Sequence, residues 1–204
     1  VIVSFSQTDD QHNREHAIGF IAGSSDRRPS SPIELTTFSV DGSVHTSTSV
    51  LLTVGSFVRE GQTDVMPFGV KNPLPEEEDQ PFEDRDPEMW LIQDIAHKRH
   101  PPERLGWPLD PRTRPIGGPS GTREVSARLA PADVDGDGVD EVVFVAPDRD
   151  GAKCIVNLAG ASGEPAALEL LDVVELDLPC YETALAITDL DTDGALDIAV
   201  LAGD

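Results

Sequence analysis

Residues 129–146 read LAPADVDGDGVDEVVFVA, and residues 185–202 read LAITDLDTDGALDIAVLA. The second segment starts 56 residues after the first and matches it position by position. Each has three aspartates at alternating positions, then a glycine, a further acid and a run of apolar residues. Internal repeats mark chains that are built from one repeated unit of secondary structure. We therefore take this pair as the unit from which the fold is assembled.

Two weaker copies of the unit lie upstream. Residues 52–70 keep the loop glycine, Gly61, and the last acid, Asp64, but they lack the acids at the first and third loop positions. No cation is therefore expected in that loop. A still fainter copy is expected to begin its loop at Ser4 and to continue into the apolar residues 17–22.

Short strands are expected on both sides of each acidic loop, and the 17 Gly and 17 Pro favour many turns over long helices. The apolar residues after each loop do not alternate with polar ones, which is typical of strands covered on both faces. Two further strands complete a unit of four strands, the size of a propeller blade. The expected strands span residues 126–130, 142–146, 154–158, 168–176, 183–187 and 198–202.

The sequence divides into three regions. Residues 1–70 carry the degenerate repeats, residues 71–122 read as a Pro-rich acidic insertion, and residues 123–204 carry the repeats with acidic loops. Inside the insertion, one short helix is expected from Asp86, its N-cap, to His100, because acids lie at its start and bases at its end. Three of its apolar residues are expected either to pack on the same domain or to dock a partner: Trp90, Leu91 and Ile95.

The alternating aspartates of each loop predict a metal site. Carboxylates that share one turn repel each other unless a cation lies between them. Calcium accepts about six to eight oxygen ligands in tolerant geometry, and a glycine at loop position six permits the sharp turn. An EF-hand would need a glutamate at position twelve, where this sequence has Phe144 and Val200. We expect two calcium ions, bound by side chains at loop positions one, three, five and nine and by the backbone carbonyl at position seven: Asp133, Asp135, Asp137, Val139 and Glu141, and Asp189, Asp191, Asp193, Ala195 and Asp197.

These residues resemble the FG-GAP repeats of integrin α-subunit propellers and the related bacterial VCBS-type repeats, in which a D-x-[DN]-x-D-G-x-x-[DE] loop holds calcium. The resemblance is close for residues 126–204, moderate for 47–70 and weak for 1–23. Glu141 replaces the aspartate at position nine, which leaves Asp140 as a competing ligand. The resemblance implies an all-β fold, here a partial β-propeller of four-stranded blades with calcium-binding loops. It also implies an extracellular or cell-surface location, with the periplasm as an alternative.

The charge of the chain excludes some partners. Its 204 residues include 15 Lys and Arg against 38 Asp and Glu, for a formal net charge of −23. Nucleic-acid binders and anionic-membrane binders need a cationic surface, so this charge argues against both. No stretch approaches the roughly 20 apolar residues of a membrane-spanning helix. The two cysteines, Cys154 and Cys180, either form one disulfide between neighbouring strands or stay as thiols.

The chain begins at Val1 without a methionine, so we expect it to be a piece of a longer polypeptide or of an assembly. Seven blades would need roughly 400 residues, and the remaining blades would then come from the same parent or from another chain. The ligand expected for such a module is a protein or a carbohydrate.

The leading function is a non-enzymatic calcium-binding propeller module for extracellular adhesion, ligand binding or scaffolding. One alternative is a propeller that serves a secreted carbohydrate- or lipid-active enzyme as its catalytic or accessory domain. Another is a structural subunit of a surface filament or envelope complex. The G-x-S-x-G-like segments 117–121 and 160–163 lack a strand-to-elbow context and read as turns, and His97 and His100 read as a solvated helix end.

Overall fold

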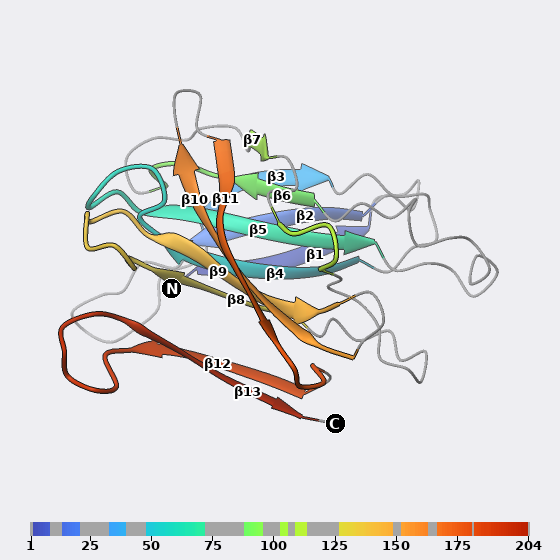
Figure 1. The fold of residues 1–204 in the computed structure, drawn as a ribbon. Helices are drawn as coiled ribbons and strands as arrows, with labels where there is room; N and C mark the ends of the chain where they lie inside the picture. The colour runs from blue at the N-terminus through green and yellow to red at the C-terminus, as the bar shows by residue number, and fades with distance from the viewer. Residues whose placement is uncertain are drawn as a thin grey trace, which may run out of the picture.

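The computed structural model describes the chain in separate ranges, whose members we call the described residues. They are residues 2–8, 14–20, 33–39, 48–71, 88–95, 103–105, 109–113, 127–148, 152–162, 167–180 and 182–203. Every regular element in them is a β-strand (Figure 1), which confirms the predicted all-β class. Among the described residues there is no helix long and apolar enough to cross a membrane.

Four antiparallel sheets follow one another along the chain. The first contains β1 (Ile2–Thr8), β2 (Arg14–Phe20) and β3 (Ile33–Ser39). The second contains β4 (Thr48–Gly55), β5 (Asp64–Lys71), β6 (Glu88–Leu91) and β7 (Glu103–Leu105). The third contains β8 (Arg128–Ala132), β9 (Glu141–Pro147), β10 (Cys154–Ser162) and β11 (Ala167–Leu176). The fourth is the hairpin of β12 (Glu182–Thr188) and β13 (Asp197–Gly203).

Within each sheet, strands that are neighbours in sequence are neighbours in space. The third sheet is the four-stranded unit that the sequence predicted, with an acidic loop between β8 and β9. The faintest copy is placed differently, because Ser4 lies inside β1 and pairs with Ile18, so no loop begins there. Strand β1 continues past this position to Thr8.

The second and third sheets pack face to face. Val142 and Phe144 of β9 are fully buried in one cluster with Met66 and Phe68 of β5. The rings of Phe68 and Phe144 meet edge to face, with centroids 5.1 Å apart. Such a pair adds about 0.5–1.5 kcal/mol beyond the burial of its apolar area, so it fixes these two sheets against each other.

The opposite face of the third sheet is covered by the fourth. Val143 and Val145 of β9 are fully buried, and Leu185 and Val200 of the β12–β13 hairpin pack against their cluster. Strand β9 is therefore covered on both faces, as its unbroken apolar run predicted. Figure 1 shows the β12–β13 hairpin as a separate layer beside β8 and β9.

The helix predicted from Asp86 to His100 is wrong in the part that the structure describes. Residues Glu88–Leu91 form strand β6, which pairs with both β5 and β7. The backbone of Ile92 then forms a bridge with Val65, with N···O distances of 2.9 Å in both directions. Residues 93–95 follow without helical structure, and residues 86–87 and 96–100 lie outside the described ranges.

The side chains of β6 explain why a strand forms. Met89 and Leu91 are buried toward the third sheet, whereas Trp90 and Ile92 are buried in a different cluster. This alternation has the period of a strand, and pairing with β5 outweighs the capping and charge signals of the local sequence. Ile95 packs partly buried against the cluster of Trp90. These residues therefore pack within their own domain, and β6 and β7 complete the second sheet from the region predicted as an insertion.

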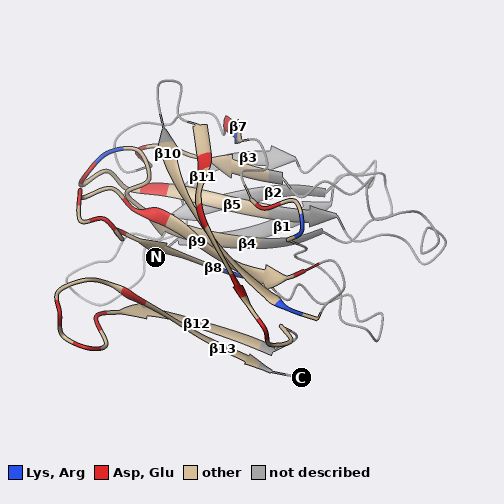
Figure 2. Ribbon diagram, viewed as in Figure 1, with Lys and Arg blue, Asp and Glu red and all other residues tan. Residues whose placement is uncertain are grey.

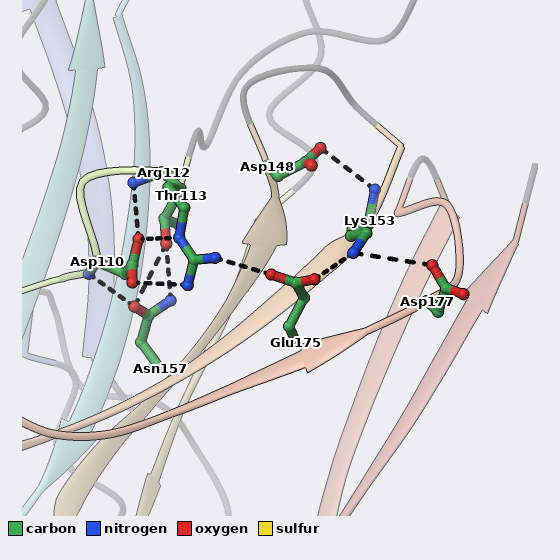
Figure 3. A network of polar contacts seen from close by, with 8 residues as sticks. All are labelled: Asp110, Arg112, Thr113, Asp148, Lys153, Asn157, Glu175 and Asp177. Carbon is green, nitrogen blue, oxygen red and sulfur yellow. Dashed lines mark hydrogen bonds and ion pairs between the residues drawn. The ribbon is translucent and has the colours of Figure 1, made fainter.

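Residues 109–113, from the same region, dock onto the third sheet (Figure 3). They bind the side-chain amide of Asn157 in β10, which is fully buried. Its Oδ1 accepts hydrogen bonds from the Asp110 backbone at 2.9 Å and from the Thr113 hydroxyl at 3.3 Å. Thr113 also forms an isolated bridge with Asp148, which follows β9. Because a buried amide without partners costs about 1–3 kcal/mol, this network fixes where the segment crosses the sheet.

Charged side chains extend this network across the surface. Arg112 binds Asp110 at 2.9 Å and Glu175 of β11 at 2.8 Å, and Glu175 also pairs with Lys153. The hydrogen bond from Arg112 lowers the pKa of Asp110, and the one from Lys153 lowers the pKa of Glu175. These exposed pairs add little stability on their own.

Cys154 and Cys180 form a disulfide, which settles the alternative that the sequence left open. Their Cα atoms lie 4.8 Å apart, and both residues are fully buried. Cys154 starts β10, and Cys180 lies between β11 and β12. The bond therefore ties the connection that leads into the β12–β13 hairpin to the third sheet.

Candidate metal centre

Three hairpins share one loop frame. Their closing strand pairs are Gly55↔Asp64, Ala132↔Glu141 and Thr188↔Asp197, which leaves eight residues in each loop. Loop positions one to eight are therefore residues 56–63, 133–140 and 189–196, and position nine is the first residue of the following strand. Figure 2 shows that the acidic residues of these loops gather at one end of the sheets.

The first acidic loop is organised around its first and last carboxylates. Asp133 accepts backbone hydrogen bonds from Gly136 at 2.8 Å and from Gly138 at 3.0 Å. Glu141 accepts one from the backbone of Val134 at 2.8 Å. Gly136 and Gly138 have φ angles of 79° and 88°, a region that glycine adopts without a steric penalty. The turn thus folds the chain around Asp133.

The two middle acids of this loop each accept a backbone hydrogen bond from two residues further on. Asp135 accepts from the backbone of Asp137 at 3.1 Å, and Asp137 accepts from Val139 at 2.8 Å. These are the Asx turns that aspartate favours. All four acids are therefore oriented by the backbone of their own loop.

The second acidic loop repeats this scheme. Gly194 has a φ angle of 94°, and Thr192 has one of 64° at the position of Gly136. A positive φ is rare and unfavourable for a β-branched residue. The second loop therefore keeps the backbone conformation of the first although Thr192 disfavours it. The hydrogen bonds, at 2.8–3.2 Å, run from Leu190 to Asp197, from Asp193 and Gly194 to Asp189, from Asp193 to Asp191 and from Ala195 to Asp193.

Each loop brings three carboxylates together. One oxygen from each of Asp133, Asp135 and Glu141 lies within 4.8 Å of the other two. Asp189, Asp191 and Asp197 form the same arrangement in the second loop. At such distances two unit charges repel by about 1 kcal/mol in water and by several times more near a protein surface. The oxygen-only donor set is one that hard cations prefer.

The other predicted ligands lie outside these two groups. Asp137 and Asp193, at position five, belong to neither group and each accept the N–H of position seven instead. These hydrogen bonds fix the backbone of the position-seven residues, Val139 and Ala195. Coordination by the position-five carboxylates and by the position-seven carbonyls stays a prediction.

Glu141 is the most enclosed of the clustered acids, with 7% of its surface exposed. Burial raises its pKa, and the negative charges of Asp135 and Asp137 raise it further, whereas the hydrogen bond from Val134 acts in the opposite direction. Burial and the neighbouring negative charges thus disfavour the ionised form of this carboxyl group. A cation between the carboxylates would favour the ionised form of Glu141 and so lower its pKa.

The loop of residues 56–63 satisfies its last acid without a cation. Asp64 is fully buried, and its carboxylate accepts hydrogen bonds from the backbones of Val58 at 3.1 Å and Asp94 at 2.9 Å and from the Gln62 side chain at 2.7 Å. Ser56 and Val58 stand where the other loops have aspartates, as the sequence showed. The amide of Gln62 and the distant Asp94 could not be connected with Asp64 from the sequence pattern.

Asp140 has a different role from the competing ligand that the sequence suggested. Its Oδ2 accepts a hydrogen bond from the backbone of Ser56 at 2.6 Å, and its own N–H donates to the Ser56 carbonyl at 2.9 Å. The first acidic loop is thereby joined to the loop of the preceding sheet. The two residues are 84 positions apart, so no local signal could have revealed this contact.

Gly138 lies at the same junction. A Cβ atom at this position would come within 2.7 Å of the Glu60 side chain. Glycine is therefore needed here both for the left-handed backbone and for the close approach of the neighbouring loop.

Among the described residues, the segments considered as catalytic alternatives do not form an active-site arrangement. Gly160 and Ser162 lie within β10, so the turn predicted there is wrong. Residues 117–121, His97 and His100 lie outside the described ranges. Comparison of the chain with protein families, with curated proteins and with solved structures found no match in any of the three.

Proposed function

We propose that this chain is a calcium-binding module of a partial β-propeller that serves extracellular adhesion, ligand binding or scaffolding. Each of its two acidic loops would hold one calcium ion. The ions would cross-link the two strands of each hairpin and keep the loop ends of the sheets rigid. A protein or carbohydrate ligand would then be recognised by loops that calcium holds in place.

The observation that carries the proposal is the organisation that the two loops share. In both, the carboxylates at positions one, three and nine converge, and the same backbone groups orient them. Solvated acidic turns have no reason to keep this arrangement twice, because like charges at such distances repel. The loop of residues 56–63 lacks two of these acids. Its last acid, Asp64, is stabilised by hydrogen bonds from the protein instead of by a cation.

Calcium suits the loops better than magnesium does. Magnesium requires a nearly ideal octahedron at about 2.0–2.1 Å, whereas calcium accepts irregular sets of carboxylate and carbonyl oxygens at about 2.3–2.6 Å. The face-to-face packing of the two four-stranded sheets supports the propeller arrangement. The disulfide between Cys154 and Cys180 supports an oxidising compartment, as expected for an extracellular or cell-surface protein.

Thermal unfolding with and without calcium tests the proposal. A ligand at about 100 times its dissociation constant stabilises the folded state by about 2.7 kcal/mol per site, or about 5 kcal/mol for two sites. In a chain of this length that corresponds to a rise in Tm of about 10–20 °C. We expect Asp135→Ala and Asp191→Ala each to lose about half of the rise.

The matched control is Asp177→Ala, which removes the same charge from a side chain that is 96% exposed. It should keep the full response to calcium. The proposal fails if calcium does not raise the Tm of the wild-type chain, or if both loop variants respond as the control does. An equal response to magnesium would refute the choice of calcium.

A further inference from the structure

The preceding sheet holds the first acidic loop at its eighth position, Asp140. This position lies between Val139 and Glu141, which are both predicted calcium ligands. The N–H of Asp140 donates to the carbonyl of Ser56 at 2.9 Å, and its Oδ2 accepts a hydrogen bond from the N–H of Ser56 at 2.6 Å. Ser56 directly follows β4 of the second sheet. Another sheet therefore binds the loop at the residue that separates two ligands.

One of these hydrogen bonds orients the predicted ligand at position seven. The N–H of Asp140 and the carbonyl of Val139 belong to the same peptide unit. A trans peptide is planar, with its N–H and its carbonyl on opposite sides, so the carbonyl of Ser56 fixes the direction of the Val139 carbonyl. The second hydrogen bond, to the carboxylate of Asp140, fixes the same residue again. The neighbouring sheet thus sets the direction of a ligand that it does not supply.

Close packing connects the two hairpins at this junction. A Cβ atom on Gly55 would lie 2.7 Å from Oδ2 of Asp140 and 2.9 Å from Cβ of Pro131. A Cβ atom on Gly138 would lie 2.9 Å from the carboxyl carbon of Glu60. The hairpins therefore touch at two places, and a shift of one must move the other.

The charges at the junction favour its closed form when a cation is bound. Glu60 and Asp140 bring two more carboxylates to a loop that already holds those of positions one, three, five and nine. Without a cation these like charges oppose the approach of the two hairpins. A calcium ion in the loop attracts the same carboxylates. The contribution of Glu60 is the smaller one, because its side chain is exposed and solvent screens it.

The second acidic loop differs at the same position. Leu196 stands there and has no carboxylate. Among the described residues, the backbone of Leu196 forms no hydrogen bond with another sheet. The preceding hairpin carries the first acidic loop, which begins with Asp133 where the loop of residues 56–63 begins with Ser56. The two calcium sites therefore differ in how the neighbouring sheet supports them.

We propose that Asp140 is a positioning residue for the first calcium ion, and that this ion in turn holds the second sheet against the third. Calcium binding at the first loop and closure of the junction favour each other by the same factor, as thermodynamic linkage requires. The second site binds calcium without this coupling. The inference rests on the proposed function, because it concerns the ion of the first loop.

Two single-site chains separate the ions: Asp191→Ala keeps the first site and Asp135→Ala keeps the second. Calorimetric titration with calcium compares each chain with and without Asp140→Ala. Coupling between sites usually changes affinity about 5- to 150-fold, so we expect the dissociation constant of the first site to rise at least about fivefold. That of the second site should stay within about twofold, as for distant, independent sites.

Asp140→Asn separates position from charge. It keeps an acceptor oxygen for the N–H of Ser56 and removes the negative charge, so it should raise the dissociation constant of the first site clearly less than alanine does. An equal rise in the two variants would show that the charge alone acts, and would overturn the positioning role. A first site that Asp140→Ala leaves unchanged would overturn it as well.

Hydrogen exchange of the Ser56 amide, followed by NMR, tests the coupling from the other sheet. Calcium should slow this exchange about fivefold or more in Asp191→Ala, and clearly less in Asp135→Ala. Equal slowing in both chains would reflect general stabilisation and overturn the coupling. Asp140 is unchanged in both chains, so this measurement decides even if Asp140→Ala does not fold. If neither chain binds calcium, the proposed function fails as well; if both bind it and the Ser56 exchange does not respond, only this inference fails.

Discussion

The contact between Asp140 and Ser56 gives the sharpest prediction for stability. Replacing Asp140 with alanine removes the acceptor of a 2.6 Å hydrogen bond and leaves the Ser56 N–H without its partner. A hydrogen bond to a charged group contributes about 1.5–3 kcal/mol. Because this one is only partly buried, we expect a loss at the lower end of the range, about 1.5–2 kcal/mol. For a chain of this length the Tm should fall by about 3–8 °C.

The assay is thermal unfolding in EDTA, so that calcium does not contribute. Asp140→Asn keeps an acceptor oxygen without its charge and should lose about half as much as alanine. Asp177→Ala removes the same charge from an exposed site and corrects for the relief of a net charge of −23. If Asp140→Ala melts within about 1 °C of this control, the contact does not hold the two sheets together and our reasoning about the junction is wrong.

Three further predictions concern single sites. The pKa of Glu141 is raised in the folded chain, so without calcium its contribution to stability is present below its unfolded pKa and is lost as the pH rises through its folded pKa. Glu141→Gln should abolish this loss, which urea denaturation at acidic and at neutral pH measures. The same variant should weaken the response to calcium. Asn157→Leu should cost about 2–3 kcal/mol in urea denaturation, because the buried Thr113 hydroxyl and its neighbours lose their partner; an unchanged midpoint would show that the segment docks without this amide. Replacing Cys154 and Cys180 together with alanine should cost about 3–4 kcal/mol, since the bond closes a loop with a sequence separation of 26, and equal stability of oxidised and reduced wild type would contradict this.

The repeat made much of the fold predictable from sequence. Paired loops with glycine at position six and acids at fixed positions define hairpins, and the unbroken apolar run after each loop indicated the two-sided burial of β9. These signals are local and occur twice, so each copy supports the other. The same signals selected the carboxylates of Asp133, Asp135 and Glu141, which the structure brings together.

Tertiary contacts decided what the sequence pattern could not. Residues 88–91 carry the charge pattern of a helix, but their alternating burial between two clusters makes them a strand. The partners of Asp140 and Asp64 come from segments far away in the chain, and neither follows from a motif. The pairing of Cys154 with Cys180 likewise depends on how β10 lies beside the connection to β12.

Calcium content is the most direct test of the central claim. Equilibrium dialysis of the purified chain against calcium, followed by elemental analysis, counts the ions bound per chain at saturation. The loop geometry predicts two ions for the wild type, one for either Asp135→Ala or Asp191→Ala, and none for the double variant. A wild-type chain that binds no calcium, or a double variant that still binds two ions, would contradict the assignment of these loops as metal sites.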